Sequence, residues 1–176
     1  MFEQFTELLR KGLQGGGQSV VLLTDQDIQR LMEERKTLST DPASALQRKS
    51  KRRGFLEKEI TAGGTDGSEF LILVRETTFN PLDFSVILCY LPKETNTRFR
   101  LRRYNGRSHQ HSNLIEKEQF YDLHIHYATQ RYQELGCRED AYAQRTDRYS
   151  DLATALKCLL HDCAFDLPEE PQKALF

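Results

Sequence analysis

Four of the chain's five histidines fall within 18 residues, between position 109 and position 126. They form two His-x-His pairs, His109 with His111 and His124 with His126. Imidazole titrates near neutral pH, so histidines that face one cleft can supply a general base and a general acid without a cofactor. A strand presents alternate side chains on one face, so an extended FYDLHIH segment directs His124 and His126 the same way. The pattern predicts an imidazole-lined site.

Arginines precede the histidines in the segment RFRLRRY, residues 98–104. If this segment is a regular strand, Arg98, Arg100 and Arg102 lie on one face and Phe99 and Leu101 on the other. Guanidinium groups stabilise the negative charge that develops on a phosphodiester as it is cleaved. The histidines and arginines together favour acid–base cleavage of RNA.

Two other interpretations fit the same residues. A His-x-His pair on a strand also occurs as a ligand pair for zinc or manganese, and Asp122 or Glu116 would complete such a site. Alternatively, the histidines satisfy hydrogen bonds in a purely structural network. His161 stands alone on the polar side of a predicted helix, and we assign it no function.

The elements around this segment predict an α+β fold. Apolar residues recur at helical spacing near both ends of the chain, whereas the middle alternates with the period of strands. Short connections between strands favour antiparallel neighbours. We therefore expect an antiparallel meander sheet of four to five strands, with N-terminal helices and a C-terminal helix packed on it. The expected helices are 1–14, one beginning at Thr24, 129–135 and 150–163; the expected strands are 54–61, 68–78, 82–91, 97–104 and 120–126.

A chain of 176 residues has the size of one ordinary domain. We expect a single domain, 1–176. Within it, residues 1–50 form a helical N-terminal part and residues 51–127 the antiparallel sheet with the His/Arg site. Residues 128–166 form C-terminal helices, and residues 167–176 a loose tail.

Composition narrows the functional classes. Lys and Arg number 25 and Asp and Glu 26, so the net charge of −1 gives no basic field for bulk nucleic acid. The four cysteines have no CxxC spacing, which favours free thiols. No apolar run is long enough to span a bilayer, and the first residues lack the pattern of a signal peptide. We expect a cytoplasmic protein without membrane association, and no metal or other cofactor.

The segment RRYNGRSHQHSNLIEKEQFYDLHIHY resembles an uncharacterised family of bacteria and mobile elements. The hallmark of that family is an Arg-x-x-Asn-Gly turn, a histidine a few residues later, and a His-x-His-x-Tyr strand. The segment is distantly similar to the TumE-type toxins of toxin–antitoxin systems. The family strand carries Asp where this chain has Tyr104. Positions that correspond to the hallmark are Arg102, Asn105, Gly106, His109, His124, His126 and Tyr127, although Tyr127 follows His126 directly, one position earlier than in the hallmark.

The resemblance implies a metal-independent ribonuclease-like protein of a toxin–antitoxin or phage-conflict system. His109 and His124 would form the acid–base pair, His126 would orient them, and Arg102 would clamp the phosphate. Arg100, Arg103, Arg107, Asn105 and Tyr127 are the predicted substrate-binding residues. The expected partners are RNA and a cognate protein, either an antitoxin or a target enzyme. A non-catalytic protein-binding module is the alternative, and a His-ligated metal hydrolase is third.

Overall fold

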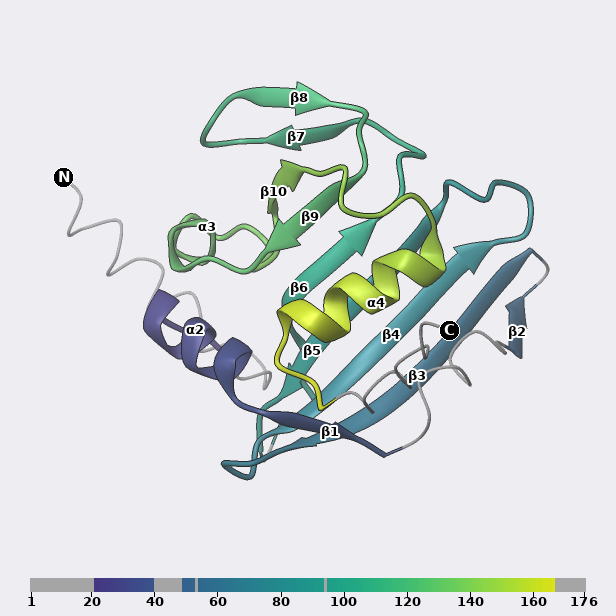
Figure 1. Ribbon diagram of the computed structural model, residues 1–176. Coiled ribbons are helices and arrows are strands. Elements are labelled where there is room, and N and C mark those ends of the chain that lie inside the picture. The colour runs from purple at the N-terminus through teal and green to yellow at the C-terminus, as the bar shows by residue number, and fades with distance from the viewer. Residues whose placement is uncertain (1–20, 40–48, 53, 94, 167–176) are drawn as a thin grey trace, which may run out of the picture.

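The computed structural model describes residues 21–39, 49–52, 54–93 and 95–166. Within them the chain forms a large, mostly antiparallel sheet, a separate two-stranded hairpin and three helices (Figure 1). The elements are α2 (Asp25–Glu33), β1 (Lys36–Leu38), β2 (Lys49–Arg52), β3 (Phe55–Gly64), β4 (Glu69–Thr77), β5 (Phe84–Leu91), β6 (Phe99–Asn105), β7 (His111–Asn113), β8 (Glu118–Phe120), β9 (His124–Tyr127), α3 (Gln130–Glu134), β10 (Tyr142–Arg145) and α4 (Leu152–Asp162).

The predicted α+β class is confirmed, but the sheet is larger than four to five strands. Its order is β1-β3-β4-β5-β6-β9-β10, and β2 also pairs with β3. The meander from β3 to β6 follows the chain, as the short turns predict. The additional strands are short: β1 and β2 lie in the part predicted to be helical, and β10 lies among the predicted C-terminal helices. Strands of three or four residues are too short to show a clear period of two.

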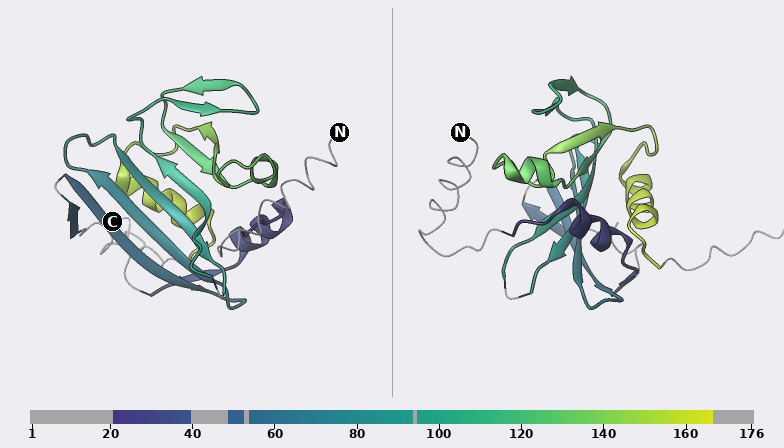
Figure 2. Two further views of the ribbon diagram at one scale, coloured as in Figure 1. Left: turned by 180° about the vertical axis from the view of Figure 1, so that it is seen from behind. Right: turned by 90° about the vertical axis from the view of Figure 1, so that its left-hand side faces the viewer.

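Helix α4 covers one face of the sheet (Figure 2). Its apolar residues, with Leu156 and Leu159 almost fully buried, pack against alternate residues of the central strands such as Ile72 and Leu88. Helix α2 adds Leu31 to the same core. Both helices begin with a capping box, as the sequence indicates for α2. The larger core therefore lies on the α4 side. A smaller buried cluster on the opposite face of β4 and β5 consists of Leu71, Leu73, Ile87 and Cys89, and the same face of β6 and β9 carries polar residues.

An irregularity in β6 decides which arginines share a face with the histidines. The register between β5 and β6 shifts between Leu88 and Cys89, so that Cys89 pairs with Arg100 and Leu88 with Arg102. Beyond this shift, Arg102 lies opposite Tyr127 and Arg103 opposite His126. The predicted regular alternation is therefore wrong at this point, because a bulge adds one residue to a strand and reverses the faces that follow it.

Several predictions lie outside the described residues. The helix predicted over 1–14 and the tail 167–176 belong to this group, and so does Asp41-Pro42, a pair typical of the start of a short helix or turn. The predicted helix beginning at Thr24 corresponds to α2 and the one over 150–163 to α4, while the one over 129–135 is the short α3.

Candidate functional site

The hairpin β7–β8 brings His111 onto the two histidines of β9, on the sheet face opposite α4. The ring centroid of His111 lies 5.1 Å from that of His124 and 4.7 Å from that of His126. The His124 and His126 rings are 4.8 Å apart, and His109 lies 5.9 Å from His124. Phe120 of β8 packs at the edge of the cluster. The four imidazoles from two segments form one group, here called the histidine cluster.

The last residue of β6, Asn105, pairs with His124 of β9 and lies beneath the cluster. The side chain is only 3% exposed, and its Nδ2 lies 3.5 Å from Nε2 of His124 and 3.4 Å from Nε2 of His126. A Cβ at the next residue, Gly106, would lie 1.9 Å from the Leu82 carbonyl oxygen. This close approach of two backbone segments directly after Asn105 therefore requires glycine at position 106.

Backbone carbonyls fix the tautomers of the two histidines on β9. Nδ1 of His124 lies 2.7 Å from the Asp122 carbonyl oxygen, which can only accept a hydrogen bond. Nδ1 therefore carries the proton and Nε2 carries a lone pair, to which Asn105 donates through Nδ2. The same Nδ2 faces Nε2 of His126, so that nitrogen also accepts, and Nδ1 of His126 donates to the Asp140 carbonyl at 2.9 Å.

Asn113 fixes the tautomer of His111. Its Oδ1 accepts from the Ala143 backbone N–H at 2.9 Å and its Nδ2 donates to the Ala143 carbonyl at 2.8 Å, which sets the orientation of the amide. Nε2 of His111, 2.9 Å from that Oδ1, must therefore donate. Its Nδ1 keeps the lone pair. Each of the three inner histidines, His111, His124 and His126, thus donates from one ring nitrogen to the protein and carries a lone pair on the other; in His124 and His126 that lone pair faces Nδ2 of Asn105.

A buried carboxylate holds the arginine that faces the cluster. Asp140 is fully buried, and its Oδ2 lies 2.9 Å from Nε of Arg103 in an ion pair whose angle is not that of a directed hydrogen bond. Nη2 of Arg103 lies 3.0 Å from Nδ1 of His126. Nδ1 of His126 already donates its proton to the Asp140 carbonyl, so it cannot accept a hydrogen bond from Arg103, and the two side chains are only close neighbours. Burial lowers the pKa of Arg103 to about 10, and the nearby Asp140 opposes this shift.

His109 differs from the other three because it is exposed. Its Nδ1 lies 3.1 Å from Oγ of Ser108, and that hydroxyl donates to Oδ1 of Asp83 at 2.9 Å. Since the Ser108 proton points to Asp83, the hydroxyl oxygen accepts from His109 Nδ1–H. Nε2 of His109 is then left with its lone pair. A carboxylate, a hydroxyl and an imidazole in series hold the imidazole in one orientation and one tautomer.

The inner histidines are held neutral. His124 is fully buried and His126 is 3% exposed. Burial, which disfavours a charged imidazole, lowers the pKa of His124 to about 4 and lowers the pKa of His126 further. Burial also lowers the pKa of the half-buried His111. At neutral pH these three rings are proton acceptors or ligands, and they are poor proton donors.

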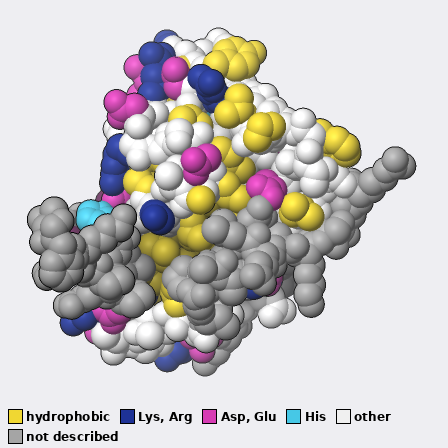
Figure 3. Space-filling view, turned by 45° about the vertical axis from the view of Figure 1, so that its right-hand side comes forward, with side chains coloured by type: hydrophobic (Ala, Val, Ile, Leu, Met, Phe, Trp, Pro, Cys, Tyr) yellow, Lys and Arg dark blue, Asp and Glu magenta, His cyan; other side chains and the backbone are white. Residues whose placement is uncertain are grey.

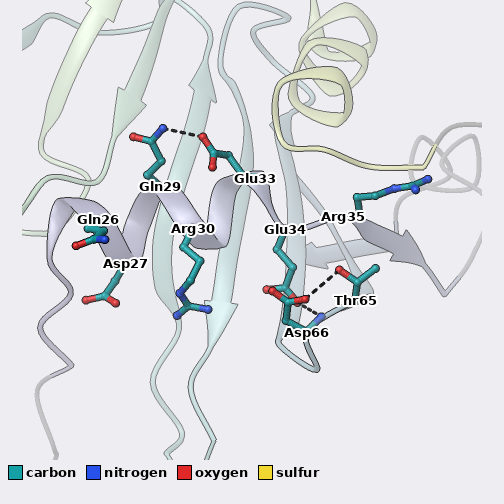
Figure 4. A pocket seen from close by; sticks show the side chains of 9 residues that line it. All are labelled: Gln26, Asp27, Gln29, Arg30, Glu33, Glu34, Arg35, Thr65 and Asp66. Atoms are coloured by element: carbon teal, nitrogen blue, oxygen red, sulfur yellow. Dashed lines mark hydrogen bonds between the residues drawn. The ribbon is translucent and has the colours of Figure 1, made fainter.

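A cleft of about 480 Å³ opens beside the cluster and is lined by His109, Asn105 and Arg103. Its other walls carry Arg75 and Phe84 along with acidic side chains. Two further cavities lie elsewhere. One of about 770 Å³ lies between α2 and the β3–β4 turn, where Glu34 and Asp66 come together (Figure 4), and it contains none of the predicted site residues.

The other predicted residues do not join the cluster. Arg102 stacks on the Tyr127 ring at 4.5 Å on the α4 side and lines a third cavity of about 560 Å³ with Asp162. Arg100 is bound to Glu139 through its backbone and side chain. Arg107 is exposed in the loop after β6. Of the predicted arginines, only Arg103 therefore faces the histidines.

Neither carboxylate predicted as a metal ligand joins the three inner histidines. Asp122 pairs at the surface with Arg145 and approaches His124 only through its backbone carbonyl. Glu116 accepts hydrogen bonds from Arg131 and Tyr132, outside the cluster.

Sequence reasoning missed the residues that hold the histidines. Asn113 stands two positions after His111, a spacing that places both on one face of a strand, so this partner was detectable. Asp140 and Asp83 had no such signal, because tertiary contacts alone bring them to the site, whereas Ser108 is the sequence neighbour of His109.

Comparisons with protein-family models, with curated proteins and with solved structures gave no match. None of the described helices is long and apolar enough to cross a membrane.

Proposed function

We propose that the protein cleaves RNA phosphodiesters at the cleft beside the histidine cluster, with His109 as the acid–base group that meets the substrate. The observation that supports this most strongly is the chain from Asp83 through Ser108 to His109, which leaves Nε2 of an exposed imidazole available in a cleft. The proposed setting, a toxin–antitoxin or phage-conflict system, rests on the family resemblance alone, and the proposed cytoplasmic location rests on the four free cysteines.

The roles follow from accessibility. His109 takes a proton from the ribose 2′-hydroxyl as its oxygen bonds to phosphorus, and returns that proton to the 5′-oxygen as the P–O5′ bond breaks. Arg103 is the cation closest to the cluster, and its guanidinium would stabilise charge on the phosphoryl oxygens. His124 was predicted as the partner of His109, but full burial and a pKa lowered to about 4 make it unsuited to donate a proton at neutral pH. It acts in this proposal as an unprotonated neighbour.

The electrostatics favour a short RNA segment over a long one. In the cleft, Arg75 pairs with Glu57 at 2.6 Å and Arg103 pairs with Asp140, so neither guanidinium adds uncompensated charge. On the face shown in Figure 3, basic and acidic side chains are interspersed and no basic field forms. A substrate bound by one or two phosphates would lose affinity only weakly with salt, because the slope follows the number of phosphate contacts.

The test is cleavage of a short fluorescent RNA by the full chain, with and without added divalent metal ions. His109→Ala should lower the rate by about 10²–10⁴-fold, with an unchanged thermal melt because the side chain is exposed. The matched control is His161→Ala, which removes an exposed histidine of α4 outside the cleft. Wild-type protein that leaves RNA intact under both conditions would refute the proposal, and so would equal rates for wild type and His109→Ala.

A second candidate function, binding of a cognate protein, is favoured by the hairpin β7–β8. Leu114 is 67% exposed and Tyr121 is 62% exposed, and Ile115 lies beside Leu114 in the turn. Exposed apolar and aromatic side chains of this kind anchor protein interfaces. Co-purification of a partner that is lost in Leu114→Ser with Tyr121→Ser, without nuclease activity of the isolated chain, would favour this function over cleavage.

A further inference from the structure

The three inner histidines lie close enough together to share a metal ion after a small adjustment of their rings. One ligand nitrogen from each of His111, His124 and His126 lies within 4.8 Å of the others. Around a tetrahedral zinc ion, with Zn–N bonds of about 2.0–2.1 Å, ligand nitrogens stand about 3.3 Å apart. Small rotations of the rings would close this difference, and the hairpin that carries His111 is attached to the main sheet by few contacts.

The hydrogen bonds of the cluster are those that metal-bound histidines require. A ligand imidazole presents one unprotonated nitrogen to the ion and donates its other N–H to a carbonyl or carboxylate, which fixes the tautomer. His124 donates to the Asp122 carbonyl and His126 to the Asp140 carbonyl. His111 donates to the amide oxygen of Asn113. All three histidines therefore donate one N–H to an oxygen of the protein and keep a lone pair on the other nitrogen. Packing of the rings alone would not require this shared pattern.

Asn105 gives an independent indication of a ligand. Its Nδ2 faces the lone pairs of His124 and His126, while its Oδ1 is buried and has no hydrogen-bond partner among the described residues. An unsatisfied buried amide oxygen is costly. Rotation of the amide by half a turn would bring Oδ1 to the position that Nδ2 now occupies, where it could contact an ion or a water bound to it. The same rotation would leave the histidine lone pairs free for coordination.

The donor set selects the kind of ion. Three neutral imidazoles and an amide oxygen contain no carboxylate, and Mg²⁺ and Ca²⁺ prefer charged oxygen ligands. Imidazole suits zinc, nickel, cobalt and copper. Three protein nitrogens leave a fourth position open, which is the arrangement of catalytic rather than structural zinc sites.

We propose that His111, His124 and His126 bind one divalent ion of the zinc–cobalt–nickel group, with Asn105 beside the open fourth position. This departs from the metal-independent chemistry expected from the sequence. Metal binding does not depend on RNA cleavage. Only a catalytic role of the ion rests on the proposed function: as a Lewis acid next to the cleft, the ion would polarise a phosphoryl oxygen or a bound water while His109 moves the proton.

The test is titration of the metal-free full chain with Co²⁺, followed by its visible absorption, and displacement by Zn²⁺. Wild type should bind about one equivalent with the intense bands of tetrahedral cobalt. His111→Gln should bind at least about 100-fold more weakly, and Asn113→Ala, which frees the His111 ring, about 10-fold more weakly. His111 is half-buried in the hairpin outside the main sheet, so His111→Gln should leave the fold intact, as circular dichroism would verify.

The control is His161→Gln, which removes an exposed histidine and should bind cobalt like the wild type. Less than about one tenth of an equivalent bound by the wild type would overturn the proposal. Equal affinity of wild type and His111→Gln would also overturn it, because the ion would then sit elsewhere. RNA is absent from this titration, so an inactive protein that binds cobalt refutes only the proposed function.

Discussion

Replacing Asp140 by asparagine should be among the most damaging single changes at the site. Asp140 is fully buried, and its carboxylate pairs with Arg103 and with Arg138 while its carbonyl orients His126. Asparagine has nearly the same shape, so the change removes the charge and leaves the Arg103 guanidinium, with a side chain 14% exposed, without its counter-charge.

The magnitude follows from the burial of the pair. Removing one partner of a buried ion pair costs about 3–5 kcal/mol, because the remaining charge is uncompensated in a medium of low polarity. The Arg103 contact lacks the angle of a directed hydrogen bond, which favours the lower end of that range. Arg138 is 48% exposed, so its share is at most about 1 kcal/mol. We expect a loss of about 3 kcal/mol.

Urea denaturation of the metal-free protein measures this loss. The matched control is Asp122→Asn, which makes the same change beside His124 in a surface pair with Arg145, where both side chains are about 60% exposed; it should cost less than about 1 kcal/mol. Combining Asp140→Asn with Arg103→Met should restore part of the stability. A cost below about 1 kcal/mol for Asp140→Asn, or strictly additive effects in the double variant, would refute the reasoning.

Three further predictions concern stability. Below pH 6.5 the unfolded chain protonates His124 before the folded one does, because burial lowers the folded pKa to about 4. In urea unfolding of the metal-free protein, His124 should account for a loss of up to about 3 kcal/mol between pH 6.5 and pH 4, and His126, whose pKa is lowered further, should add to this loss; His124→Gln should remove the share of His124 from the slope. Tyr104→Phe should cost about 1.5–3 kcal/mol in the same assay, since the buried phenol donates to the Asp162 carboxylate at 2.8 Å; no change would contradict this. Gly106→Ala should cost about 2 kcal/mol or more because its Cβ would overlap a backbone carbonyl, whereas Gly63→Ala meets no atom within 4 Å and should be neutral; similar melting temperatures for the two variants would show that the loop adapts.

The sequence predicted the central strands because their periods are regular and long. The run from Glu69 to Thr77 and the run from Phe84 to Leu91 carry enough apolar residues to identify them as the middle of a sheet. The capping box at Thr24 likewise located the start of α2. Short strands such as β10 carry too few residues for a period, and only their pairing partners define them.

The candidate site was predictable where it depends on local spacing. Alternation in β9 correctly placed His124 and His126 on one face. The assignment of Arg102 to the same face failed, because the bulge in β6 cannot be seen in the residue pattern and exchanges it with Arg103. His111 proved more central than His109, since the hairpin turns it inward. Asp140 could not be predicted, because its contacts with Arg103 and His126 come from tertiary structure and follow no sequence spacing.

The tautomeric states of the imidazoles test the central claim most directly. RNA cleavage and metal binding both need unprotonated ring nitrogens in the histidine cluster. Long-range proton–nitrogen correlation spectra of the metal-free protein at pH 7, labelled with ¹⁵N-histidine, report the protonation of each ring nitrogen. The account predicts Nδ1–H with a bare Nε2 for His124 and His126, and Nε2–H with a bare Nδ1 for His111. Protonated imidazolium rings, or Nε2–H on His124 or His126, would contradict it.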